Sequence, residues 1–165
     1  MLTIKKAGTE AIPVIREMAH AIWPVAYADI LAPQQIEYML DKMYNAATLQ
    51  QQMQEGQQFV LAYDADVPVA FAAYAPLGDN ALTFKLHKIY ILPNQQGRGT
   101  GRALINFITD AIAPATALRL NVNRHNKARF FYEKAGFKII AEEILDIGNG
   151  YCMDDYVMEL LVKHG

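Results

Sequence analysis

The chain contains very little cysteine and no excess of positive charge. Cys152 is the only cysteine among 165 residues, so no disulfide can form within the chain. The 15 lysines and arginines are balanced by 17 aspartates and glutamates, which gives a formal net charge of −2. Proteins that bind nucleic acid without strong selectivity usually carry a basic stripe instead. The charge balance therefore disfavours nucleic acid as the partner.

Long apolar runs are also missing. No stretch approaches the roughly 18 apolar residues that a membrane-spanning helix requires. Lys5, Lys6 and Glu10 interrupt the apolar segment that a secretory signal near Met1 would need. There is no internal repeat and no linker, and the composition, 53% hydrophobic and 19% charged, is ordinary. We therefore expect residues 1–165 to form a single cytoplasmic domain with no membrane partner.

Glycine, by contrast, is concentrated in one turn. An apolar run ending at Pro93 leads into Gln96-Gly97-Arg98-Gly99-Thr100-Gly101, after which apolar residues recur at helical spacing. Three glycines in five positions let the backbone turn tightly and approach a ligand. The following helix N-terminus presents unpaired N–H groups, which favour an anion and most often a phosphate. The turn lacks the Gly-Lys-Ser/Thr ending of a Walker loop and the third glycine of the dinucleotide fingerprint.

A second motif lies further along, Asn126-Lys-Ala-Arg-Phe-Phe-Tyr132-Glu-Lys-Ala-Gly136-Phe137. The two motifs, in this order, resemble the signatures of the GCN5-related N-acetyltransferases (GNAT). The first is similar to their Gln/Arg-x-x-Gly-x-Gly/Ala turn, and the second to their Asn and Ala leading to Tyr and Gly-Phe. The resemblance covers about residues 58–162 and extends to the first third only in outline.

Periodicity predicts seven strands, at residues 2–6, 59–63, 67–75, 81–92, 117–122, 137–147 and 151–162. It predicts a helix that Thr9 caps and Trp23-Pro24 breaks, a helix at 34–44, a short one that Thr48 caps, one after the glycine turn, and one at 126–135. The predicted fold class is α/β (α+β), a mixed, mostly antiparallel sheet with helices on both faces. The order β-α-α-β-β-β-α-β-α-β-β is the one that the resemblance implies.

The resemblance implies acetyl-coenzyme A as the cosubstrate. The amides of Gln96, Gly97, Arg98, Gly99, Thr100 and Gly101 would then hold the pyrophosphate. The pantetheine arm would lie where the strand before Pro93 separates from the strand after Ala117, against backbone groups of Ile89, Tyr90 and Ile91. The side chains of Ile89 and Ile91 are expected in the core. Asn123, Asn126 and Lys134 are further candidates, although Asn126 could serve only as an N-cap and Lys134 only as a surface lysine.

Tyr132 matches the position of the family's general acid, which returns a proton to the departing thiolate. A buried core tyrosine is the alternative. Many relatives use a Glu as the base, but Lys85-Leu86-His87-Lys88 contains no acid, so His87 is the candidate base, with His125 second. Strand alternation predicts that His87 shares a face with Lys85 and Ile89. Cys152 is expected to be buried and structural, with direct attack by the amine and no metal.

The acceptor is expected to contact the first third of the chain, where Tyr27, Asp29, Glu37 and Tyr38 combine acids with aromatic rings. The segments at 38–44, 86–90 and 153–155 are similar to the bacterial polyamine acetyltransferase branch, and such side chains suit a polycation. A small-molecule amine is therefore the expected partner. A protein N-terminus, an amino acid or an aminoglycoside stays open as acceptor. So do a non-catalytic acetyl-coenzyme A sensor and a homodimer formed by exposed strand edges near Tyr151 to Val162.

Overall fold

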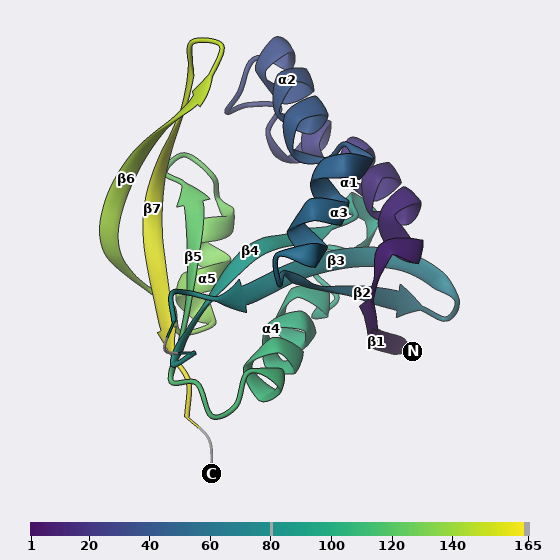
Figure 1. Cartoon of the computed structure of the whole chain (residues 1–165), viewed down its shortest axis with the longest axis vertical. Helices are drawn as coiled ribbons and strands as arrows, with labels where there is room; N and C mark the ends of the chain where they lie inside the picture. The colour runs from purple at the N-terminus through teal and green to yellow at the C-terminus, as the bar shows by residue number, and fades with distance from the viewer. Residues whose placement is uncertain (80, 164–165) are drawn as a thin grey trace.

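The computed structural model describes residues 1–79 and 81–163, which form a seven-stranded sheet (Figure 1). The strands lie in the order β1-β2-β3-β4-β5-β7-β6. Neighbouring strands are antiparallel except β4 and β5, which are parallel. The strands are β1 (Leu2–Ala7), β2 (Gln58–Asp64), β3 (Val67–Pro76), β4 (Thr83–Ile91), β5 (Ala117–Asn123), β6 (Lys138–Gly148) and β7 (Tyr151–Leu161). The predicted mixed, mostly antiparallel sheet is confirmed.

Helices cover both faces of this sheet (Figure 1). Phe59 and Leu61 of β2 join the apolar core beneath the first three helices, whereas Val60 and Ala62 join the core beneath the last two. Because successive strand side chains point to opposite faces, one strand supplies both cores. The helices are α1 (Ile12–Ala26), α2 (Pro33–Met43), α3 (Ala46–Gln54), α4 (Thr100–Ala111) and α5 (Ala128–Lys134), with short 3₁₀ helices η1 (Thr9–Ala11) and η2 (Pro93–Gln95).

The first helix does not end at its proline, so the predicted break at Trp23-Pro24 is wrong. Helix α1 continues to Ala26, and the Tyr27 amide donates to the Trp23 carbonyl at 3.0 Å. Proline removes one helical hydrogen bond and crowds the preceding turn. Ile22 and Trp23, just before it, are buried against the sheet, and this packing offsets the local cost.

Two predicted helix caps are also wrong. Thr9 lies inside η1, and no side chain caps α1. Asn45 rather than Thr48 caps α3, because its Oδ1 accepts a hydrogen bond from the Thr48 amide at 2.8 Å. With α3 present as a separate helix, three helices precede β2, one more than in the predicted order. Among the described residues, no helix is both long and apolar enough to cross a membrane.

The sheet opens between its two parallel strands. Only Thr83 to Leu86 of β4 pair with β5, opposite Ala117 to Leu120. Beyond that point β4 continues to pair with β3, and β5 continues to pair with β7. The two parallel strands therefore diverge, which leaves a wedge open between the later part of β4 and residues 121–123 of β5. This is the separation that the resemblance implies.

The free edges of the sheet belong to β1 and β6. Strand β7 lies between β5 and β6 and pairs with both. The expectation that the segment near Tyr151 to Val162 offers an exposed strand edge is therefore wrong. Sequence periodicity identifies strands but does not fix their order, and here the last strand inserts into the sheet instead of ending it.

Candidate active site

The glycine-rich turn presents an exposed backbone at the start of α4. Gly97 and Gly99 both have a φ of +81°, a left-handed conformation that side-chain-bearing residues rarely adopt. A Cβ at either position would meet nothing within 4 Å beyond the adjoining residues. Within the part of the chain that the structure describes, the amides of residues 97–102 have no hydrogen-bond acceptor. They form a cradle of N–H groups at a helix N-terminus, an arrangement that binds phosphate.

Gly101 holds this cradle against two other elements. A Cβ at Gly101 would stand 2.9 Å from Cζ of Phe131 and 3.1 Å from Cδ1 of Ile91, which is too close for any larger residue. From α4, Arg102 donates to the carbonyl oxygen of Lys134 at 3.4 Å. The start of α4, the end of β4 and the end of α5 therefore meet at the cradle, and the main chain of Lys134 lies beside it.

The other residues of the turn differ in exposure. Gln96 and Arg98 are exposed, whereas Thr100, the first residue of α4, is buried. The guanidinium of Arg98 lies 4.0 Å from the carboxylate of Asp64, and both side chains are largely exposed. Such a pair contributes little to stability, so the Arg98 side chain is free to turn toward a bound anion.

The later part of β4 borders the wedge with its main chain. The side chains of Ile89 and Ile91 pack in the core on the side of α4, as predicted. Tyr90 points to the opposite face, where its hydroxyl shares a hydrogen bond of 3.1 Å with that of Tyr27. On its free side, the backbone of this segment pairs with no strand among the described residues. It can therefore pair with an extended ligand, as an added strand would.

Tyr132 is buried in α5, with 8% of its surface exposed. Its ring packs edge-on against Phe131 and Phe137, with centroid distances of 5.5 and 5.8 Å. Burial raises the pKa of its hydroxyl, and the charge of Tyr27 raises this pKa further. Tyr27 follows α1, on the opposite face of the sheet from α5. The two phenols influence each other because β4 and β5 separate between them.

A bulge in β4 changes the predicted direction of His87. The register between β3 and β4 shifts there, so His87 has no partner between the paired positions Leu86 and Lys88. The extra residue reverses the alternation beyond it. Lys85 and His87 line the same cavity, but Ile89 packs on the side of α4. The prediction that Ile89 shares their face is therefore wrong.

His87 is neutral at physiological pH. Partial desolvation in the cavity, together with the ammonium groups of Lys85 and Lys88, lowers its pKa from 6.5 to about 4. A neutral imidazole can accept a proton or a hydrogen bond, but so low a pKa makes His87 a weak base. His125, the second candidate, is exposed and does not line the cavity.

The cavity itself has a volume of about 180 Å³ and lies where β4 and β5 diverge. Its walls come from the α1–α2 connection, α2, β4, β5 and the β6–β7 hairpin. It brings together four predicted site residues, Tyr27, His87, Tyr90 and Asn123. Cys152 also lines it and is exposed, so the prediction of a buried, structural cysteine is wrong. Alternation in an interior strand does not show which face borders a cavity.

Asp155 belongs to the segment 153–155 that resembles the polyamine branch, but the sequence did not indicate its role in the site. It lines the cavity from β7 with only 1% of its surface exposed. Its Oδ2 accepts a hydrogen bond from the Asn121 amide at 3.3 Å, and its buried Oδ1 has no partner among the described residues. Desolvation raises the pKa of this carboxyl group, and the charges of Glu143 and Asp154 raise it further. An acid within an apolar strand is the signal that could have identified it.

The two predicted asparagines support turns of the chain. Oδ1 of Asn123 accepts from the His125 amide at 2.9 Å, and Oδ1 of Asn126 accepts from the Ala128 amide at 2.9 Å. Asn126 therefore stabilises the turn before α5, but the expected N-cap role is wrong, because Lys127 is the N-cap and no side chain caps this helix. In both residues the side-chain amide N–H₂ has no partner in the described chain, so it can still donate to a ligand.

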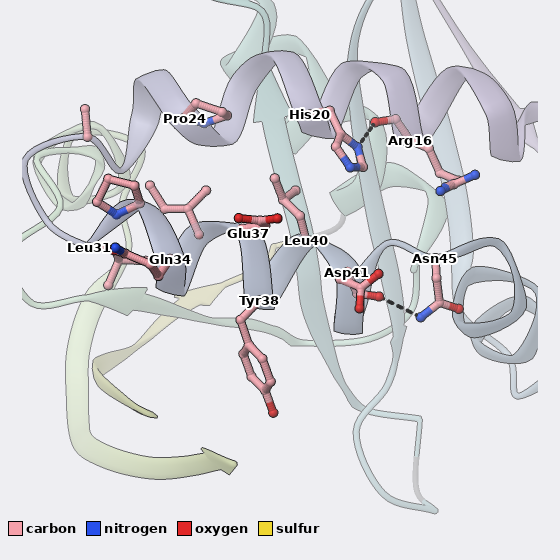
Figure 2. A pocket seen from close by; sticks show the side chains of 13 residues that line it. Arg16, His20, Pro24, Leu31, Gln34, Glu37, Tyr38, Leu40, Asp41 and Asn45 are labelled. Carbon is pink, nitrogen blue, oxygen red and sulfur yellow. Dashed lines mark hydrogen bonds between the residues drawn. The ribbon is translucent and has the colours of Figure 1, made fainter. Parts of the chain in front are cut away.

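A second, more open groove of about 890 Å³ runs between α1 and α2 (Figure 2). Glu37 and Tyr38 line this groove and not the smaller cavity. In Figure 2 Tyr38 points away from α1, and its hydroxyl donates to the Ile147 carbonyl at 2.9 Å. Asp29 is exposed and lines neither space. Of the four predicted acceptor residues, the structure therefore places only Tyr27 in the cavity.

The described residues contain no cluster of three or more His, Cys, Asp or Glu side chains that could hold a metal ion. The site offers a phosphate cradle, an open strand edge, a buried phenol and a cavity with an unpaired carboxylate. The cradle can hold a diphosphate, and the strand edge can pair with a thin, extended ligand. The phenol and the carboxylate can transfer protons.

Comparison with known proteins identifies relatives along most of the chain. The family described as acetyltransferase (GNAT) domain matches residues 27–160. An uncharacterized N-acetyltransferase of Mycobacterium bovis is 30% identical over 144 residues, covering 86% of this chain and 91% of the relative.

Solved structures share the fold. The PaiA N-acetyltransferase from Thermoplasma acidophilum, crystallised with coenzyme A, has a TM-score of 0.81 and 22% identity, covering 98% of this chain and 99% of that one. The ribosomal-protein-S18-alanine N-acetyltransferase from Escherichia coli has a TM-score of 0.73 and 20% identity, covering 100% and 96%. The family match spans most of the described residues and includes the glycine turn and Tyr132. The chain therefore belongs to the GNAT acetyltransferase family and is an acetyl-coenzyme A-dependent N-acetyltransferase.

Proposed function

We propose that the chain transfers an acetyl group to a small primary amine by direct attack within a ternary complex. The observation that carries this proposal is the cavity between β4 and β5, which combines two phenols with a buried, unpaired carboxylate. An aliphatic ammonium group suits such a site through charge pairing and contact with aromatic faces. At about 180 Å³ the cavity is smaller than the 300–1,000 Å³ typical of drug-sized ligands. It fits one end of a slender amine.

In this proposal, acetyl-coenzyme A supplies an activated acetyl thioester. The amides of residues 97–102 hold its pyrophosphate, with Arg98 and Lys134 adding positive charge nearby. The free backbone edge at Ile89, Tyr90 and Ile91 binds its pantetheine arm, and one amide there polarises the thioester carbonyl. A single donor of this kind contributes roughly 10²–10³ in rate. Asn123 and Asn126 donate their side-chain N–H groups to the same ligand.

Tyr132 acts as the general acid in this scheme. Its raised pKa keeps the phenol protonated at neutral pH, so it can give a proton to the departing thiolate. Tyr27 and His87 contact the acceptor, with the neutral imidazole of His87 accepting a hydrogen bond from it. Glu37 and Tyr38 line the groove between α1 and α2 and not the cavity, and Asp29 lines neither space. In this proposal Glu37 and Asp29 attract the acceptor only as negative charges at a distance.

We propose a polyamine such as spermidine as the acceptor. Its chain is thin enough for the cavity, and its remaining charges would lie toward the acidic surface of α2. A protein N-terminus is the second candidate, because the Escherichia coli structure that shares the fold is an enzyme for a ribosomal-protein alanine. A narrow cavity that opens near the surface could also admit the first residue of a peptide.

A thiol-release assay with acetyl-coenzyme A tests these assignments. The acceptors are spermidine, putrescine, a peptide with an N-terminal alanine, and kanamycin. We expect turnover with the two polyamines and a higher Tm in the presence of coenzyme A. Turnover with the peptide alone would favour the second candidate. Stabilisation by coenzyme A without turnover of any amine would instead favour a non-catalytic binding module.

We also propose that residues 1–165 act as one domain in the cytoplasm, where the exposed thiol of Cys152 would stay reduced. A homodimer would pair through β6, the edge strand whose Ile140 and Ile144 side chains are 47% and 71% exposed. Light scattering tests the assembly. A mass of twice 18.5 kDa supports the dimer, and a mass of 18.5 kDa contradicts it.

A further inference from the structure

The carboxylate of Asp155 is buried in the cavity wall and forms no ion pair among the described residues. Only 1% of its surface is exposed, and Oδ1 has no hydrogen-bond partner among the described residues. A buried, unpaired carboxylate is costly to keep in a folded protein. Structures usually retain such a group where a ligand completes its interactions.

The neighbouring cations do not supply the missing partner. Arg124 forms its ion pairs with Asp154, the neighbour of Asp155, and with Glu142, at 2.8 and 2.7 Å. Lys85 lines the same cavity and lowers the pKa of Asp155 slightly, but no ion pair joins the two in the described structure. The amide of Asn121 donates to both Asp155 and Glu143, at 3.3 and 3.2 Å.

Asp155 also lies beside the wedge between β4 and β5. Residue 155 pairs with Asn123, at the end of β5 that borders the wedge. The charge of Asp155 raises the pKa of Tyr27, and the charge of Tyr27 raises that of Tyr132. Tyr27, which lines the cavity together with Asp155, is therefore electrostatically coupled both to this carboxylate and to the proposed acid.

We propose that Asp155, after a side-chain rotation that opens Oδ1 to the cavity, binds the acceptor's ammonium group and removes a proton from it. This inference rests on the proposed function, because it assigns the base for that same reaction. The cavity then favours a primary ammonium group, because Asp155, Tyr27 and Tyr90 all line it.

The protons balance as follows. Asp155 takes one proton from the ammonium group, and the freed amine nitrogen forms a bond to the acetyl carbon. The carbon–sulfur bond breaks, and the sulfur takes the proton of Tyr132. The nitrogen, now carrying an excess proton, returns that proton to the Tyr132 oxygen. Asp155 finally releases its proton to solvent, so the net products are the acetamide, the free thiol and one proton.

The other titratable groups that face Asp155 fit this role less well. His87, on β4, is exposed and has a pKa lowered to about 4. Lys85 is a cation and Tyr27 a phenol with a raised pKa. From β6, Glu143 shares the Asn121 amide but does not line the cavity. Cys152 lines the cavity, but its neighbours in β7, Tyr151, Met153 and Asp154, include no histidine.

The experiment compares Asp155→Asn with the matched control Glu143→Gln. Both substitutions remove a carboxylate that accepts a hydrogen bond from Asn121. Of these two carboxylates, only that of Asp155 belongs to a residue that lines the cavity. Acetyl transfer to spermidine is followed between pH 6.5 and 9.5, with the peptide and putrescine in parallel. We expect Asp155→Asn to lower kcat/KM at pH 7 by roughly 10²–10⁴ and Glu143→Gln to change it less than threefold.

The pH profile separates a base from a structural residue. Without a base only the unprotonated amine reacts, so kcat/KM of Asp155→Asn should rise about tenfold per pH unit toward the amine pKa of about 10.4. Without ligands, Asp155→Asn should also melt at a higher temperature than the wild type, because the substitution removes a buried charge. An equal loss at every pH, or a lower Tm, would make Asp155 structural and overturn the inference.

Two further outcomes distinguish the inference from the function on which it rests. Normal turnover by Asp155→Asn, with a large loss in His87→Gln, would overturn the role of Asp155 alone and assign the base to His87. Absence of turnover by the wild type with every amine would overturn the proposed function and this inference together.

Discussion

A buried phenol such as Tyr132 can donate a proton to a strong base but does not lose one to water. Burial and the neighbouring Tyr27 raise its pKa, so its proton moves only when a thiolate forms beside it. Tyr132→Phe should therefore lower kcat by roughly 10²–10⁴ and leave the Kd for coenzyme A unchanged. Steady-state kinetics and calorimetry measure the two quantities. Tyr74→Phe, at a buried tyrosine of β3, is the control, and an unaltered kcat in Tyr132→Phe would remove Tyr132 from the mechanism.

Lys88 is an ammonium group enclosed beneath α3. It donates to Gln52 and Gln57 at 2.9 and 3.2 Å, lies over the rings of Tyr44 and Phe59, and is 8% exposed. Desolvation, with a smaller effect of Lys85, lowers its pKa from 10.5 to about 8. Between these values the unfolded chain binds more protons, so the free energy of unfolding rises with pH. Below pH 8 the full free-energy cost of burying the Lys88 ammonium charge, on the order of 3 kcal/mol, lowers the stability of the fold.

Lys88→Met should therefore increase the free energy of unfolding at pH 7, and its advantage over the wild type should shrink between pH 8 and 9.5. Urea denaturation at several pH values measures this difference. The range ends at 9.5 because the raised pKa values of buried Tyr44 and Tyr90 lower stability at higher pH. Lys138→Met, on exposed β6, is the control. If the free energies of unfolding of Lys88→Met and the wild type differed by the same amount at every pH, burial of the charge would have no cost.

Single residues could be predicted from the sequence where a motif fixes their surroundings. The glycine turn and the segment around Tyr132 each combine residues that are close along the chain, and the structure brings them together at one place. His87, Cys152 and Asp155 depend on more distant features. A bulge turns His87 into the cavity. Cys152 and Asp155 border the cavity because β7 lies between two other strands.

At the scale of elements, the phosphate cradle depends on α4 starting directly after a left-handed glycine. Gly99→Val should abolish the binding of coenzyme A, because the side chain would project into the open space above the turn and the backbone conformation would be strained. Gly78→Val is a matched control, since Gly78 also has a positive φ, +79°, and nothing within 4 Å of its Cβ position. Calorimetry should show lost binding only in Gly99→Val, and binding retained by that variant would contradict the cradle.

Element boundaries followed from local patterns except where packing overrode them. The apolar run of β2 and the turn Gly148-Asn149-Gly150 between the last two strands are both made of adjacent residues, and the structure has both elements. Helix α1 instead passes through Pro24 because Ile22 and Trp23 are held in the core. Contacts of this kind, made by residues distant in sequence, cannot be read from a proline and its neighbours.

At the scale of the whole molecule, the cavity exists because separate parts of the chain close around it. In Figure 1 the tip of the β6–β7 hairpin lies next to α2. The tip is fixed there by Tyr38, whose hydroxyl donates to the Ile147 carbonyl at 2.9 Å and whose ring lies 5.3 Å from that of Tyr151. The nearby ammonium of Lys42 donates to the same carbonyl. Helix α2 and the hairpin both contribute cavity walls, so this contact sets how tightly the cavity closes.

Tyr38→Phe tests this closure, because it removes one hydrogen bond and keeps the ring. The lost bond should lower the free energy of unfolding by about 0.5–1.5 kcal/mol. A looser hairpin should raise the KM for spermidine severalfold, while the Kd for coenzyme A stays unchanged because its cradle lies on α4. Tyr63→Phe is the control, since the Tyr63 hydroxyl forms no hydrogen bond in the described chain. A KM equal to that of the wild type would mean that α2 and the hairpin enclose the cavity without this contact.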